Sequence, residues 1–143
     1  MKRIICSLTA VILMAGAWLI YNSHAQKYRL QVVLAKELRK AMGAMMGDLG
    51  SARAVTVRGV PADGQWYHEI AFQDGKDGPV QYRIGPGDNH LNRVGRGGAH
   101  VIAGHMRALD VRRQSDNASI VEVRIQAYNG LSLTSNFKIR LQE

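Results

Sequence analysis

The sequence predicts an α+β fold, in which one long N-terminal helix packs on a mostly antiparallel β-sheet. Up to residue 50, apolar residues form first a continuous run and then a repeat at steps of three and four, which is typical of a helix. From residue 52 onward, apolar and polar residues alternate between turns rich in glycine, which is typical of strands with one wet face. Helix and strands are therefore segregated along the chain.

The first part of the predicted helix, residues 1–25, is apolar enough to suggest an anchor. A short basic start precedes the residues from Ile4 to Tyr21, which carry no charge. A helix that crosses a bilayer needs about 20 mostly apolar residues. Trp18 and Tyr21 also suit a membrane interface. We therefore expect a transmembrane segment in a single-pass protein of a bacterial inner membrane, with the C-terminal domain periplasmic or extracellular.

A cleaved secretory signal is the competing interpretation of the same segment. Signals combine a basic start, an apolar run and a cleavage site of the small-x-small type. Ser23-His24-Ala25 fits such a site. Cleavage after Ala25 would release a secreted soluble domain.

The second part of the helix, residues 26–50, is amphipathic and belongs to a predicted globular domain of residues 26–143. Its apolar residues fall along one face, and the charged residues lie mainly on the other. Four members of the apolar face are candidates for packing against a partner helix: Leu34, Leu38, Met42 and Met45. Such a stripe also fits a role as core against a sheet, so both interpretations stay open.

The β-sheet is expected over residues 52–143. Period-two segments predict strands near 54–60, 66–72, 80–84, 90–94, 121–127 and 131–141. Residues 100–111 fit either one bent strand or two short ones. Asn129-Gly130 lies between the last two segments and predicts a tight hairpin.

The chain is basic, with a formal net charge of +8. A basic surface favours anionic partners such as nucleic acid or lipid headgroups, although charge also serves solubility. Five arginines are candidate anion contacts: Arg93, Arg96, Arg107, Arg112 and Arg113. If they gather on one side, the chain could be a basic DNA-binding module for DNA uptake, with an affinity that falls steeply with salt.

No residue pattern predicts catalysis, a cofactor or a metal. The single cysteine excludes an intramolecular disulfide and cysteine-based zinc sites. The five histidines have no metal-ligand spacing, and no Ser, Cys or Lys has the setting of an activated nucleophile. We expect no enzyme activity, no cofactor and no metal site.

Several segments together resemble the family of type IV pilins and pseudopilins. An apolar helix continues into an amphipathic one that ends in Met45-Met46-Gly47-Asp48-Leu49, like the helix end of minor pseudopilins. Val80-Gln81-Tyr82-Arg83-Ile84, then Leu91-Asn92-Arg93, then Val101-Ile102-Ala103-Gly104-His105 resemble the middle sheet of those proteins. The similarity extends over nearly the whole chain. It is nearest to the minor pseudopilins of type II secretion and to competence minor pilins.

The resemblance implies a pilin-like fold and a structural role in a type IV pilus, a type II secretion system or a competence assembly. The implied partners are other pilin-like subunits, inner-membrane assembly proteins and membrane lipid. Family members usually have a glycine before the apolar run and a glutamate just after the processing site, but here no acid precedes Glu37. This difference favours an initiating, tip or accessory role over that of a bulk filament subunit.

Overall fold

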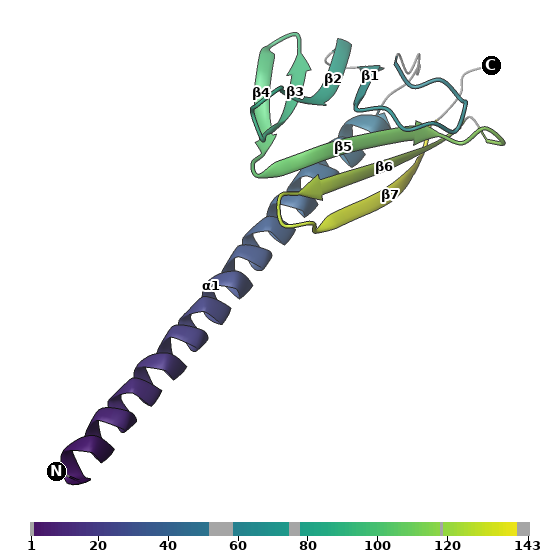
Figure 1. Cartoon of the computed structure of the whole chain (residues 1–143). Coiled ribbons are helices and arrows are strands. Elements are labelled where there is room, and N and C mark those ends of the chain that lie inside the picture. The colour runs from purple at the N-terminus through teal and green to yellow at the C-terminus, as the bar shows by residue number, and fades with distance from the viewer. Residues whose placement is uncertain (1, 52–58, 75–77, 118, 140–143) are drawn as a thin grey trace. The chain divides into compact units, whose positions relative to one another are not determined.

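A computed structural model describes residues 2–51, 59–74, 78–117 and 119–139, with residues 2–12, 51 and 74 described by their backbone alone. The chain divides into two units, Met1–Val33 and Leu34–Glu143. Helix α1 (Lys2–Ser51) contributes to both units, and seven strands follow it in the second (Figure 1). The α+β class and the N-terminal position of the helix are confirmed.

The predicted membrane span is corrected by the structure. Within the described part of the chain, no helix combines the length and the apolar character that crossing a membrane requires. The transmembrane half of the helix and the single-pass inner-membrane localisation are therefore wrong.

The second part of α1 is amphipathic, as its sequence predicts. Six buried side chains follow one another at steps of three, four or one: Leu34, Leu38, Ala41, Met42, Met45 and Leu49. This spacing places them along one stripe of the helix. Lys36, Arg39 and Lys40 lie on the opposite side and are exposed. The stripe fixes which side of the helix the sheets cover.

Two antiparallel sheets follow the helix, where the sequence predicted one. The first contains β1 (Glu69–Asp74), β2 (Gly78–Ile84), β3 (Leu91–Gly95) and β4 (Gly98–Ala103) in that order. The second contains β5 (Met106–Arg113), β6 (Ile120–Ala127) and β7 (Ser132–Lys138), also in sequence order. Every neighbouring pair is antiparallel.

The division into two sheets occurs between β4 and β5. His105 has a φ of 60°, a left-handed conformation that few residues other than glycine adopt. The chain therefore turns sharply after Gly104, and β5 pairs with β6 instead of extending β4. Of the two alternatives for residues 100–111, the structure supports two short strands.

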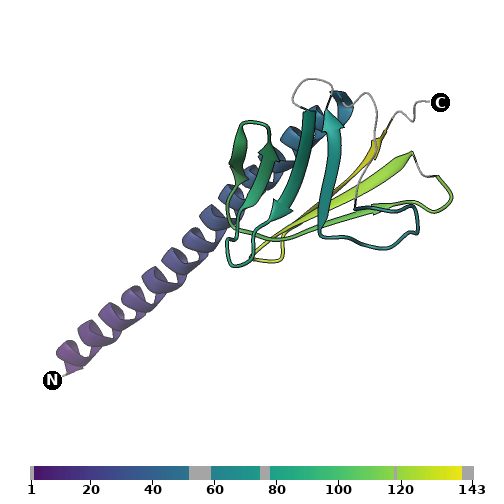
Figure 2. The same ribbon diagram turned by 90° about the horizontal axis from the view of Figure 1, so that it is seen from above.

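One hydrophobic core joins the helix to both sheets (Figures 1 and 2). β6 shows how the sheets contribute, because its inward residues are buried and the residues between them are partly exposed. The largest fully buried side chains of the two sheets are Tyr82, Ile70, Leu91, Met106, Leu109 and Ile125. The core lies where the stripe of α1 meets the inner faces of both sheets.

Polar contacts hold the helix end against the first sheet. The Tyr82 hydroxyl donates a hydrogen bond of 2.7 Å to Asp48 of α1, and Arg93 Nε donates one of 2.6 Å to the same carboxylate oxygen. The amide of Gly104 donates a hydrogen bond of 3.1 Å to Glu37, also on α1. Burial raises the pKa of Tyr82 above its ordinary range, and the Asp48 carboxylate raises it further. The protonated phenol is therefore part of the folded structure.

The remaining strand predictions are near the observed bounds. The segments near 66–72, 80–84, 90–94, 121–127 and 131–141 overlap β1, β2, β3, β6 and β7, with ends that differ by a few residues. The Asn129-Gly130 hairpin is confirmed between β6 and β7, with Gly130 at a φ of 87°. Most of the predicted strand 54–60 lies outside the described residues.

We expect truncation of the stripe to destabilise the domain, and two adjacent methionines provide a matched test. Met45 is fully buried, whereas Met46 is 53% exposed. Met45→Ala should lower the free energy of unfolding by about 2–5 kcal/mol because it leaves a cavity. Met46→Ala should change it by no more than about 0.5 kcal/mol. Urea denaturation of both variants measures the difference, and equal effects would contradict this placement of the stripe.

The buried phenol should be visible in an alkaline titration. A pKa that is raised in the folded state stabilises the protein fully below the unfolded pKa of about 10, and this stabilisation is lost as pH rises through the folded value. Tyrosinate absorbance should therefore show that the last tyrosine to ionise does so at a higher pH in the folded protein than in urea. Tyr82→Phe should remove this last step of the folded-state titration. If the step persists in the variant, it belongs to another tyrosine, such as Tyr67, whose pKa is also raised.

Candidate assembly interface

The four residues predicted to pack against a partner helix lie in the core of the chain itself. Leu34, Leu38, Met42 and Met45 are 2%, 4%, 4% and 0% exposed. They contact the core that α1 shares with both sheets. Their surface is used within the domain, as the second interpretation of the stripe expected.

Among the described residues, most of the exposed large apolar side chains lie on the first part of α1. Between residues 13 and 33, the exposed fraction of the large apolar side chains is between 50% and 75%. These side chains are Leu13, Met14, Trp18, Leu19, Ile20, Tyr21, Tyr28, Leu30, Val32 and Val33. We call this set the apolar helix surface. Contiguous apolar surface of this kind marks an interaction site.

The apolar helix surface is not confined to one stripe. Residues 18–21 are four consecutive exposed apolar residues, and four consecutive residues point to all sides of a helix. A helix that is apolar all round is normally buried by its surroundings. The sequence already showed the run of apolar residues, and the structure adds that each of these side chains is at least half exposed.

The five candidate anion contacts are spread over both sheets. Arg93 of β3 is paired with Asp48, and Arg112 of β5 is paired with Glu122 across the strand pair. Arg113 is the neighbour of Arg112 in β5 and so points to the opposite face of that sheet. Arg96 in the turn after β3 and Arg107 near the start of β5 are exposed. These five side chains therefore do not form one basic face.

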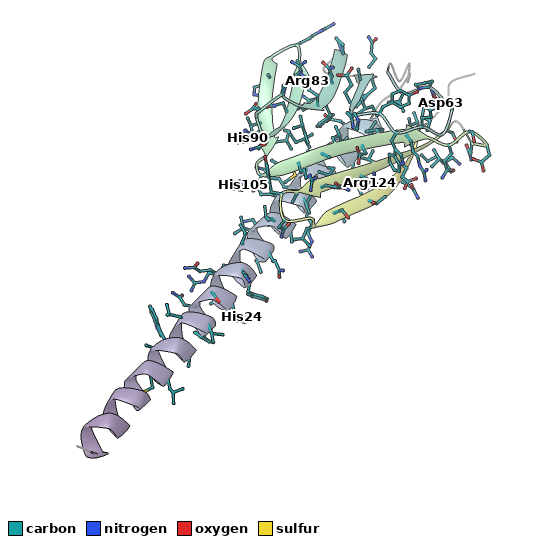
Figure 3. The ribbon with its side chains drawn as sticks, in the orientation of Figure 1. His24, Asp63, Arg83, His90, His105 and Arg124 are labelled. Atoms are coloured by element: carbon teal, nitrogen blue, oxygen red, sulfur yellow. The ribbon has the colours of Figure 1, made fainter. Side chains whose placement is uncertain are left out.

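A cluster on the outer face of the second sheet was not predicted. The guanidinium carbons of Arg112 and Arg124 each lie 4.5 Å from the ring centre of Trp66, close enough for cation–π attraction. Arg124 donates two hydrogen bonds, of 3.0 and 2.9 Å, to Asp110 Oδ2 (Figure 3). His68 Nδ1 lies 3.1 Å from Asp110 Oδ1. The sequence showed Trp66 only as one residue of a strand, because these partners are far away along the chain.

The segment before β1 is fixed to the edge of β5 by this cluster and by the backbone. Tyr67 and Val111 exchange two backbone hydrogen bonds of 2.8 and 2.7 Å. The Tyr67 hydroxyl also donates a hydrogen bond to Asp63, which lowers the pKa of that carboxyl and raises the pKa of Tyr67. Residues 63–68 therefore cover one edge of the second sheet.

A polar group surrounds the turn between β2 and β3. His90 Nδ1 lies 2.7 Å from Asp88 Oδ1, and this bond, with a second from Asn92, holds the pKa of Asp88 below its usual range. The His90 ring also lies against Gly104, next to His105 (Figure 3). Among the described residues, no group of three or more His, Cys, Asp or Glu side chains is arranged to hold a metal ion.

A shallow pocket of about 560 Å³ lies at one end of the first sheet. Side chains from β1, β2 and β3 and from Arg96 line it. Among the described residues that line it, Arg96 is the one charged side chain.

Comparison with known proteins gives no match from which a function could be inferred. No family model matches the chain, and no curated protein or solved structure is similar to it. The fold and the exposed surfaces described above are therefore the basis for a functional proposal.

The Asp110 contacts should contribute measurably to stability. Asp110 is 6% exposed and receives bonds from Arg124 and His68, so Asp110→Ala would leave those donors without their acceptor. We expect a loss of about 1–3 kcal/mol in the free energy of unfolding. The exposed Asp116 provides the control, since Asp116→Ala should change stability by less than about 0.5 kcal/mol. Thermal unfolding compares the two variants. An Asp110→Ala protein that is as stable as the wild type would show that the cluster does not contribute to stability.

Proposed function

We propose that this chain is a structural subunit of a pilin-like assembly, of the minor pilin or pseudopilin kind. In this role residues 13–33 of α1 pack against the helices of neighbouring subunits. The order of elements supports the proposal, since one N-terminal helix precedes antiparallel strands and its second part is the core of the domain. The observation that carries it is the apolar helix surface.

Helices are the occupants that suit this surface best. A helix that is apolar on all sides can be surrounded by other helices, whose side chains interlock with its ridges and grooves. Full burial of one large apolar side chain contributes about 1.5–3 kcal/mol. Ten such side chains on one segment therefore offer a strong drive for association, even after the entropy of association is subtracted.

The charges near this surface favour a specialised position in the assembly. Lys27 and Arg29 lie between members of the apolar helix surface and are exposed, and the first acid in the sequence is Glu37. Glu37 accepts a hydrogen bond from Gly104 within the domain. We propose an initiating, tip or accessory role, because the segment offers no carboxylate of its own for pairing with a neighbouring subunit. Pilus, secretion and competence assemblies all use such subunits.

Nucleic-acid binding has less support than assembly. Phosphate contacts require cations that converge on one surface. Of the five arginines considered for this role, Arg93 and Arg112 are engaged by carboxylates, and the set is divided between two sheets. We therefore propose other pilin-like subunits as the partners.

A charge placed in the apolar helix surface should prevent assembly. Ile20 is 62% exposed, so Ile20→Glu should not disturb the domain, but it would bury a carboxylate among apolar neighbours in the assembly. We expect association to weaken by at least about tenfold, which corresponds to 1.4 kcal/mol. Crosslinking in cells followed by co-purification measures the yield of pilin-like partners.

Met46→Glu is the matched control for this test. It adds the same charge to the same helix at an exposed position outside residues 13–33, and the partner yield should stay unchanged. A wild-type chain that remains monomeric and captures no pilin-like subunit would overturn the proposal.

A further inference from the structure

We propose that the pocket of β1, β2 and β3 binds a small organic carboxylate, whose charge lies at Arg96 and whose flat apolar body lies on the sheet. The pocket belongs to the unit of residues 34–143. The inference therefore does not depend on how the apolar helix surface is used.

The pocket lies on the face of the first sheet that is turned away from the core. Phe72 of β1 and Val80 of β2 are 3% and 1% exposed and belong to the core. Because side chains alternate along a strand, the residues on either side of these two point to the opposite face. These neighbours are Ala71, Gln73, Pro79 and Gln81, and all four line the pocket. The sheet itself therefore separates the pocket from the core.

The size and the floor of the pocket suit a small molecule with an apolar body. Its volume of about 560 Å³ falls within the range of about 300–1,000 Å³ that is usual for ligand sites. Three short apolar side chains, those of Ala71, Pro79 and Val94, line it. The strand register sets Ala71 and Val94 on either side of Gln81, so the floor extends across β1, β2 and β3 (Figure 1). A flat apolar group can lie on such a floor.

Arg96 gives the pocket its charge. The guanidinium lies over Gly78 at the start of β2, where a Cβ atom would be 2.8 Å from Arg96 Nε. The absence of a side chain at Gly78 thus lets the guanidinium rest against β2, beside the pocket. Among the carboxylates in the described part of the chain, none is paired with Arg96. A guanidinium matches the two oxygens of a carboxylate, so Arg96 is suited to bind the anionic end of a ligand.

The charges around the pocket favour a ligand with one negative charge. Phosphate groups are normally held by several donors at once, whereas the described lining residues include one guanidinium. Glu69 and Arg83 lie opposite each other in the strand register, beyond Ala71 and Gln81, so their charges offset each other. Gln81 Nε2 donates a hydrogen bond of 2.9 Å to Glu69. Arg96 is therefore the net positive charge that a ligand meets on this floor.

Four probes of matched structure test the inference on the full chain: benzoate, benzamide, acetate and phenyl phosphate. NMR titration follows the side-chain amide signals of Gln73 and Gln81 and the methyl signals of Val94. We expect benzoate to shift these signals and to bind at least about tenfold more tightly than benzamide, which lacks the charge. Acetate, which lacks the apolar body, should also bind at least about tenfold more weakly than benzoate.

Two arginine variants separate the pocket from the general charge of the chain. Arg96→Gln should weaken the binding of benzoate by at least about tenfold, because it removes the charged donor. Arg107→Gln removes the same charge from an exposed position of β5 outside the pocket and should leave the affinity unchanged.

Ala71→Leu tests the floor without a change of charge. Ala71 lies on the outer face of β1, so the larger side chain fills the pocket and leaves the core unaltered. We expect it to weaken the binding of benzoate by at least about fivefold, since the apolar body loses its contact with the sheet. Ile20→Glu should bind benzoate as the wild type does, which distinguishes failure of helix-mediated assembly from failure of this inference.

Four results would overturn the inference. The first is equal affinity for benzoate and benzamide, which would show that the charge is not recognised. The second is tighter binding of phenyl phosphate than of benzoate, which would assign the site to phosphate groups. The third is an equal loss of affinity in Arg96→Gln and Arg107→Gln. The fourth is the absence of any shift in the signals of Gln73, Gln81 and Val94 with all four probes.

Discussion

The stripe of apolar side chains on residues 34–49 of α1 is the constraint on which the rest of the domain depends. Each sheet has one inner face that must be covered, and neither is large enough to cover itself. The stripe is shared by both sheets, since its members belong to the same core as the inward residues of β2, β5 and β6. Without this common surface, a four-stranded and a three-stranded sheet would have little reason to adjoin.

Two carboxylates make this packing specific. Glu37 and Asp48 are eleven positions apart, close to three helical turns, so both lie on the same side of α1. Each meets a different part of the fold, Glu37 at the turn between the sheets and Asp48 at Tyr82 and Arg93. Apolar contacts alone would tolerate a slip of the helix by one turn. These polar contacts would be broken by it and would leave buried groups without partners.

The spacing of apolar residues and the turn residues in the sequence were sufficient to predict several features of the fold. The amphipathic half of the helix, the order of the strands and the hairpin at Asn129-Gly130 all follow from local spacing and turn chemistry. The break at His105 could not be predicted, because it depends on one unusual backbone angle. The cluster at Trp66 was missed because its members come from three separate segments. The predicted membrane span was wrong, because no helix in the described part of the chain is both long enough and apolar enough to cross a membrane.

The distances along the chain between these contacts bear on how the protein folds. Asp48 and Arg93 are separated by 45 residues, His68 and Asp110 by 42, and Glu37 and Gly104 by 67. A helix forms from local contacts within about a microsecond, whereas pairings across such separations require closure of long loops and come later. The stripe of α1 is therefore presented to solvent before the sheets exist to cover it. During synthesis this interval exposes an apolar helix of a kind that chaperones bind and that aggregates at high concentration.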